Sequence, residues 1–307
     1  MVRERSSVQI RQVAQYAYPL YIVFVRTAMA TMNNTRYLTK TDFICYLQCP
    51  KSFWLLKHKP EVYPHREFSD FLKKIVREGY EVEEYAQQLF DGGVVLPSGS
   101  SAPEKTREAL SSDASVFFQA TFHTDDHMFA RVDVLERNDD GTYTLYEVKS
   151  STRIKKDAKH NHIKDACFQV IALERSGLVV RDVFIIHVNG EYIRGEDLEP
   201  YVLLRRACVT DAVRDVEEKT GVEVNQALTL LAEDSIDENG CGCYRKTRSN
   251  HCDSFLYFNR MPDTHSVWEL CGIRERKLLA LQDCGAERLC DVPDAACLLY
   301  TSPSPRD

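Results

Sequence analysis

The stretch MFARVDVLERNDDGTYTLYEVK, residues 128–149, decides the predicted fold. Asp133 is a lone acidic side chain between two valines, in a run that predicts a strand over residues 128–137. An Asp-Asp-Gly turn follows, and residues 142–149 predict the next strand. If the two strands pair across this turn, Asp133 and Glu147 converge near one end of the sheet.

This convergence would create a site for a hard divalent cation. Side chains alternate along a strand, so Glu147 and Lys149 share one face. A carboxylate in an apolar strand, such as Asp133, costs free energy unless it is paired or binds a cation. Two carboxylates beside the backbone carbonyl of Val148 suit Mg²⁺ or Mn²⁺, and Lys149 could orient an attacking water. The alternative interpretation is a solvated cross-strand salt bridge.

The residues that follow these strands are basic. From Lys149 to Lys164 there are six Lys or Arg residues and one Asp. Such a segment beside two carboxylates favours a polyanion, although alone it would indicate only a solvated loop. The predicted DNA-backbone contacts are Arg153, Lys155, Lys156 and Lys159.

A helix is predicted over residues 161–176, with Gly177 after its C-terminus. It carries His162, Asp165 and Gln169 on one polar face, which places Gln169 near the carboxylates.

These residues together resemble the PD-(D/E)XK nuclease superfamily, in its RecB-like branch. The match consists of Glu83 within Gly79-Tyr-Glu-Val-Glu83, then Asp133, Glu147-Val-Lys149 and Gln169. Many relatives have His where this chain has Glu83, and Leu173 stands where an aromatic residue is usual.

The resemblance implies a restriction-endonuclease-like α/β fold with a mixed central sheet flanked by helices. It implies a Mg²⁺- or Mn²⁺-dependent deoxyribonuclease, an exonuclease, that hydrolyses DNA phosphodiester bonds in repair, recombination or defence. The implied metal ligands are Glu83, Asp133, Glu147 and the carbonyl of Val148, and the implied catalytic residues are Asp133, Glu147, Lys149 and Gln169. In a similar group of uncharacterised bacterial proteins an exonuclease-like domain often follows, and we expect that it is missing from a truncated chain here.

The chain has eleven cysteines, and Cys241, Cys243 and Cys252 lie within one loop that suits a metal. A four-thiolate site needs one more ligand. By resemblance to iron–sulfur CRISPR-associated and AddB-type nucleases, that ligand is Cys49 and the group is a [4Fe–4S] cluster. The cysteine spacing departs from those relatives, so Zn²⁺ or no metal stays open.

The expected organisation has five parts. They are a non-native or disordered N-terminal extension (1–34), a nuclease core (35–235), a cysteine-cluster loop (236–262), a helix-hairpin-helix-like segment (263–297) and an unstructured, foreign tail (298–307). A plain helical hairpin is the alternative for the fourth part. Outside residues 128–176, we expect helices over 66–90, 104–112, 200–219 and 225–233, a strand over 115–122, and a hairpin of 183–188 with 191–194 around Asn189-Gly190.

Composition narrows the functional classes. With 44% hydrophobic and 28% charged residues, the chain reads as soluble and globular, and its net charge of −7 argues against a histone-like protein. We expect a cytoplasmic protein without a membrane span. The sequence has no GxxxxGK[ST], HExxH or GxSxG motif, so motor, zincin and esterase classes find no support. A non-catalytic, cluster- or zinc-bearing DNA-binding protein with a degraded nuclease site is the alternative function.

Overall fold

The computed structural model describes residues 36–64, 69–156, 161–262 and 265–293. The expected terminal segments 1–34 and 298–307 lie outside these residues, as does Lys159. The described chain forms two compact units. The sheet unit comprises residues 36–40 and 69–228, and the cysteine unit comprises 41–64 and 229–293. The expected core of 35–235 included residues 41–64, which belong instead to the cysteine unit.

The sheet unit is built on a mixed seven-stranded sheet in the order β2-β3-β4-β5-β6-β7, with β1 beside β4. Strands β3, β4 and β5 are antiparallel neighbours, and β6 pairs with β5 in parallel and with β7 in antiparallel fashion. The strands are β1 (Leu38–Thr39), β2 (Val94–Val95), β3 (Val116–His123), β4 (Met128–Arg137), β5 (Tyr143–Lys149), β6 (Val180–Val188) and β7 (Leu204–Cys208). The predicted mixed α/β architecture is confirmed at this level.

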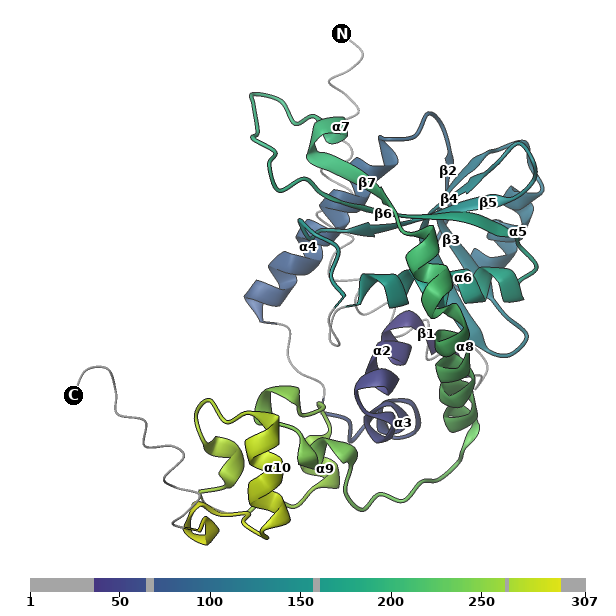
Figure 1. The fold of residues 1–307 in the computed structure, drawn as a ribbon. Helices are drawn as coiled ribbons and strands as arrows, with labels where there is room; N and C mark the ends of the chain where they lie inside the picture. Colours follow the sequence, from purple (N-terminus) through teal and green to yellow (C-terminus); the bar gives the residue numbers. More distant parts are fainter. Residues whose placement is uncertain (1–35, 65–68, 157–160, 263–264, 294–307) are drawn as a thin grey trace. The chain divides into compact units, whose positions relative to one another are not determined.

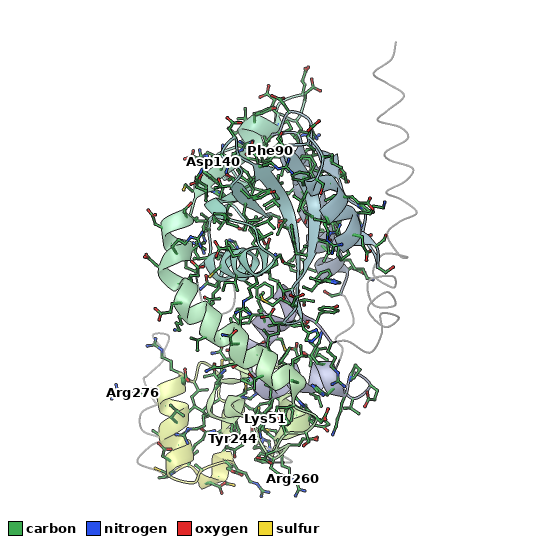
Figure 2. All side chains as sticks on the ribbon, turned by 90° about the vertical axis from the view of Figure 1, so that its right-hand side faces the viewer. Lys51, Phe90, Asp140, Tyr244, Arg260 and Arg276 are labelled. Atoms are coloured by element: carbon green, nitrogen blue, oxygen red, sulfur yellow. The ribbon has the colours of Figure 1, made fainter. Side chains whose placement is uncertain are left out.

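Helices cover both faces of this sheet (Figure 1). The helices of the unit are α4 (Asp70–Gln87), α5 (Ala102–Leu110), α6 (His162–Arg175), α7 (Pro200–Leu203) and α8 (Thr210–Ala232), whose last turn lies beyond the unit boundary. Helix α4 packs Val82 and Ala86 against Tyr146 and Val148 of β5. Phe90, which is labelled in Figure 2, extends this cluster, and its ring makes an edge contact with that of Tyr146. Since Glu147 alternates with these residues, it points to the opposite face, which α6 covers.

Helix α6 confirms the predicted helix of residues 161–176. Asn161 caps its start, because its side-chain oxygen accepts a hydrogen bond from the Lys164 amide at 3.1 Å. Gly177 follows its end with φ +88°, a left-handed conformation that favours glycine. The helix connects the parallel strands β5 and β6. Both ends of α6 are therefore fixed by local chemistry, which sets the positions of its polar side chains.

The predicted hairpin around Asn189-Gly190 is wrong. The strand that pairs with β6 is β7, residues 204–208, and residues 191–194 form no strand. The Asn189 side chain accepts a hydrogen bond from the Glu191 amide at 3.1 Å, so a local turn does form. However, the Asn189 backbone amide donates to the Leu203 carbonyl at 2.7 Å. The turn thus leads into a longer connection, and the predicted helix over 200–219 is interrupted by β7 and begins again with α8.

The cysteine unit is formed from short elements. They are α2 (Lys40–Gln48, whose first residue belongs to the sheet unit), α3 (Pro50–His58), α9 (Phe255–Phe258), α10 (Glu275–Asp283) and the 3₁₀ turns η1 (Gly242–Arg245), η2 (Arg248–Asn250), η3 (Val267–Glu269) and η4 (Leu289–Asp291). Trp54 is almost fully buried and donates its indole N–H to the Glu233 carbonyl at 2.8 Å. After Gly285 the expected second helix of a hairpin is only the three-residue turn η4. Within the described part of the chain, no helix has the length and apolar character needed to cross a membrane.

Candidate functional site

Strands β4 and β5 place Asp133 and Glu147 opposite each other. Their antiparallel ladder ends at the pair Val134↔Tyr146, and the same register one residue further sets Asp133 against Glu147. The Asp133 Oδ2 accepts a hydrogen bond from the Val148 amide at 2.8 Å. Strand β1 pairs with the start of β4, at Leu38↔Met128. Because β3 pairs along one edge of β4, both β1 and β5 pair along its other edge. Asp133 therefore lies in the part of β4 between its pairing with β1 and its pairing with β5, a stretch here called the gap between β1 and β5, and Glu147 faces it from β5.

Glu147 is the most heavily bonded side chain of this gap. It is 1% exposed, and its Oε1 lies 2.6 Å from the Lys40 Nζ and 2.7 Å from the Lys149 Nζ. Its Oε2 accepts a hydrogen bond from the Gln169 amide of α6. Burial alone would raise the pKa of Glu147, but the Lys149 and Lys40 ammonium groups hold that pKa well below its usual range. Glu147 is therefore an ionised, buried anion.

The pKa values of the two neighbouring carboxyl groups, Asp133 and Glu83, are raised rather than lowered. Burial, followed by the negative charge of Glu147, raises the pKa of Asp133 to about 8. The pKa of Glu83, on α4, is also raised, chiefly by burial and against the attraction of Arg131. The Glu83 Oε2 accepts a hydrogen bond from Gln119 at 3.2 Å. Glu83, Asp133 and Glu147 are here called the carboxylate cluster, and a nearby cation would favour the ionised form of Glu83 and Asp133.

Lys149 is fixed between two acids. Its Nζ lies 2.7 Å from Asp165 Oδ2 of α6 as well as 2.7 Å from Glu147 Oε1. Burial would lower the pKa of Lys149, but Glu147 and Asp165 raise it above its usual value. Burial and the Lys149 charge lower the pKa of His162 to about 4, so this imidazole is neutral. Lys149 is thus a permanent cation that can orient a water or a phosphate oxygen, and it is no proton acceptor.

The donor chemistry of the carboxylate cluster fits Mg²⁺ or Mn²⁺, which take oxygen ligands. Gln169 supports this fit, because its buried Oε1 has no hydrogen-bond partner within the described structure. The three carboxylates do not, however, all bring an oxygen within 4.8 Å of one another. The Glu147 Oε1 is instead paired with the Lys40 ammonium at 2.6 Å.

The basic segment lies directly after β5 and before α6. Arg153 and Lys156 are exposed, and Lys155 is half-buried. The Lys155 carbonyl accepts a hydrogen bond from the His162 amide at 3.0 Å, and the Lys155 amide donates to His162 Nδ1 at 3.3 Å. The segment is therefore tied to the start of α6, the helix that carries Asp165 and Gln169.

Four cysteines come together in the cysteine unit. Cys49, Cys241, Cys243 and Cys252 are all buried, and their sulfur atoms lie within 4.8 Å of one another. None of these thiols is in a disulfide. Cys49 precedes α3, Cys241 precedes η1 and Cys243 lies in η1. This group, the cysteine centre, could bind a metal or a cluster.

The surroundings of Cys241 favour a thiolate. The Asn259 Nδ2 donates a hydrogen bond to its Sγ at 3.2 Å. Hydrogen bonds from Cys243 and Cys252 lower the pKa of Cys241 well below its usual range. The Sγ atoms of Cys241 and Cys252 are 3.9 Å apart, close to the value of about 3.8 Å that tetrahedral Zn–S bonds of 2.3 Å require. A four-iron cluster is larger and would need the thiols to move apart.

Sequence reasoning missed Lys40 and Gln119. Lys40 contacts Glu147 across 107 residues of sequence, and no motif marks it. Gln119 interrupts the apolar pattern of β3 and has φ +60°, an unusual conformation that turns its amide toward Glu83. The signal available for Gln119 was a polar amide that directly follows three apolar residues at the start of β3.

Comparison with known proteins identifies no family for this chain. No family model matches the chain, and no curated protein matches it. Among solved structures, one titled "Crystal structure of SSO0001" is similar over 69% of this chain and 86% of that chain, with 8% sequence identity and a TM-score of 0.33.

Proposed function

We propose that this chain is a metal-dependent nuclease that hydrolyses DNA phosphodiester bonds, with a restriction-endonuclease-like core of the RecB-like kind. One observation carries the proposal. The carboxylates of Asp133, which is half-buried, and Glu147, which is buried, stand opposite each other at the end of a strand pair, with the Lys149 ammonium fixed 2.7 Å from Glu147. An acid pair beside a fixed cation suits phosphoryl-transfer chemistry, in which extra negative charge develops.

Each residue has a role in this proposal. Asp133, Glu147, Glu83 and the Val148 carbonyl would hold Mg²⁺ or Mn²⁺, which stabilises the charge that develops on the phosphate. Gln169 keeps Glu147 oriented through its amide. Lys149 positions the attacking water or a phosphate oxygen. Arg153, Lys155 and Lys156 would bind the DNA backbone without reading sequence.

The test is a cleavage assay on end-labelled single- and double-stranded DNA, with Mg²⁺, with Mn²⁺ and with chelator. The proposal expects metal-dependent cleavage by the wild-type protein and none by Asp133→Asn, which should still bind DNA. Product lengths report whether cleavage starts at an end, as expected of an exonuclease, and with which polarity. Wild-type protein that binds DNA and cuts neither substrate in either metal contradicts the proposal.

A second candidate function is a DNA-binding protein with a degraded nuclease site. The observation in its favour is that the Lys40 ammonium lies on Glu147, where a metal would bind. In that case the lysine replaces the metal permanently. Calorimetry with Mn²⁺ separates the two functions, because the degraded site predicts no binding that depends on Asp133.

For the cysteine centre we propose a structural metal group that joins residues far apart in the chain. A colourless protein with one zinc per chain would support a single tetrahedral ion, in line with the 3.9 Å sulfur separation. A brown protein with about four irons per chain would support a [4Fe–4S] cluster. Protein purified without either metal, and with four thiols that react freely, would contradict a metal centre.

A further inference from the structure

Lys40 reaches the carboxylate cluster from a fixed backbone. It directly follows β1, whose Leu38 is fully buried and donates its amide to the His127 carbonyl at 2.8 Å. Strand β1 lies parallel to the start of β4, with Thr39 in register with Phe129. The Lys40 side chain therefore enters the gap between β1 and β5 from an anchored position.

The Lys40 charge acts on all three carboxylates. Its Nζ lies 2.6 Å from Glu147 Oε1. The same ammonium lowers the pKa of Asp133 and of Glu83, opposing the effect of burial on each. Lys40 thus supplies, from within the chain, part of the positive charge that this cluster requires.

Glu147 does not need Lys40 in order to stay in place. Lys149 binds the same Oε1 at 2.7 Å, and Gln169 holds Oε2. Lys149 is itself held by Asp165. The Lys40 side chain is 29% exposed, against 18% for Lys149. Lys40 is therefore already close to water, and its ammonium can move into solvent by a small change of side-chain conformation. Of the two lysines on Glu147, Lys40 is therefore the one that can leave.

We propose that Lys40 is a resident cation that occupies Glu147 in the metal-free protein and is displaced when a divalent ion binds the carboxylate cluster. This inference rests on the proposed function. A divalent ion bound to Glu147 would add positive charge beside the two ammonium groups already on Oε1, and this repulsion is relieved when the more exposed of them, Lys40, leaves. Displacement would bring the three carboxylates together on the metal and leave the Lys40 ammonium free to meet a DNA phosphate. Lys40 is then a positioning residue that tunes metal affinity.

Calorimetric titration with Mn²⁺ tests this proposal. Lys40→Met removes the competing charge, so we expect its Mn²⁺ dissociation constant to fall by about tenfold or more, equivalent to about 1.4 kcal/mol. Lys164→Met is the matched control, because Lys164 is also a part-buried lysine of the sheet unit and pairs with Glu223 outside the cluster. Asp133→Asn identifies the binding heat that belongs to this site.

The outcomes separate this inference from the proposed function. A dissociation constant that is unchanged or larger in Lys40→Met overturns the role of Lys40 and leaves the metal site standing. Absence of Asp133-dependent binding in both the wild type and Lys40→Met overturns the metal site and the nuclease proposal with it.

A second measurement uses the unaltered protein and does not depend on a variant folding. Lysine amines are methylated reductively with and without Mg²⁺, and the extent at each lysine is read by mass spectrometry. We expect Lys40 to be protected without metal and to become severalfold more reactive with Mg²⁺, while Lys164 stays constant. Equal reactivity of Lys40 in both conditions, at Mg²⁺ levels that saturate the site, overturns the displacement.

Discussion

Replacing Glu147 by Gln should destabilise the metal-free protein much more than replacing Asp133 by Asn. Glu147 is the ionised partner of two ammonium groups, at 2.6 Å and 2.7 Å, and is 1% exposed. Removing one member of a buried ion pair costs about 3–5 kcal/mol, because the remaining charge stays buried. Lys149 keeps Asp165 and Lys40 can reach water, so we expect the lower end, about 3 kcal/mol. This is a large share of the total free energy of unfolding of a domain, which is only about 5–15 kcal/mol.

Asp133→Asn also replaces an acid by its amide, but we expect a much smaller effect on the free energy of unfolding. The pKa of Asp133 is raised to about 8, so at neutral pH this half-buried side chain is largely uncharged already. An Asn oxygen can still accept the hydrogen bond from the Val148 amide. We therefore expect its stability to change by less than about 1 kcal/mol, or to rise.

Urea titration in the presence of chelator, followed by far-UV circular dichroism, measures both free energies of unfolding. Both variants should lose cleavage, so stability is what distinguishes their roles. Equal destabilisation by the two substitutions, or a larger effect of Asp133→Asn, would refute the assignment of Glu147 as the charged member of the cluster.

Three further predictions concern other parts of the molecule. Gly93→Ala should lower stability by about 1–3 kcal/mol, measured by urea titration, because a Cβ there would lie 2.5 Å from the Phe118 ring and Gly93 has φ +114°; an unchanged midpoint would contradict this geometry. Cys243→Ser should release the metal proposed for the cysteine centre, seen as loss of bound zinc or iron in elemental analysis and a lower melting temperature; full metal content would exclude Cys243 as a ligand. Exchanging Arg153 and Lys156 for Ala should weaken DNA binding equally for all sequences and reduce the salt dependence by about one ion per lost phosphate contact; an unchanged salt slope would remove this segment from the interface.

The sequence was sufficient where local patterns determine structure. Alternation along residues 128–149 predicts both strands, and the short turn between them fixes the register that sets Asp133 against Glu147. The helix over 161–176 follows from its periodicity together with the cap residue Asn161 and Gly177. These features depend on neighbours in the chain, so one sequence contains their signals.

Features that depend on distant contacts were not predicted. Asn189 does form a turn, but its backbone bonds to Leu203 and the partner strand comes from 204–208, which local propensity cannot select. Lys40 contacts Glu147 only through the fold, because β1 is a two-residue strand that the tertiary structure positions. Three members of the cysteine centre could be grouped because they lie close together in the sequence. Cys49 was predicted as the fourth member only from the family resemblance.

The wide separation of Cys49 from its three partners affects the order of events during synthesis. About 190 residues lie between Cys49 and Cys241, and ribosomes add about 5–20 residues per second, so the first thiol emerges roughly 10–40 s before the others. The four-thiol group therefore forms only after Cys252, the last of the four thiols, has left the ribosome. The metal proposed for this centre can be fully bound only after that point, so a cell short of that metal would hold chains that contain all four thiols with the centre still open.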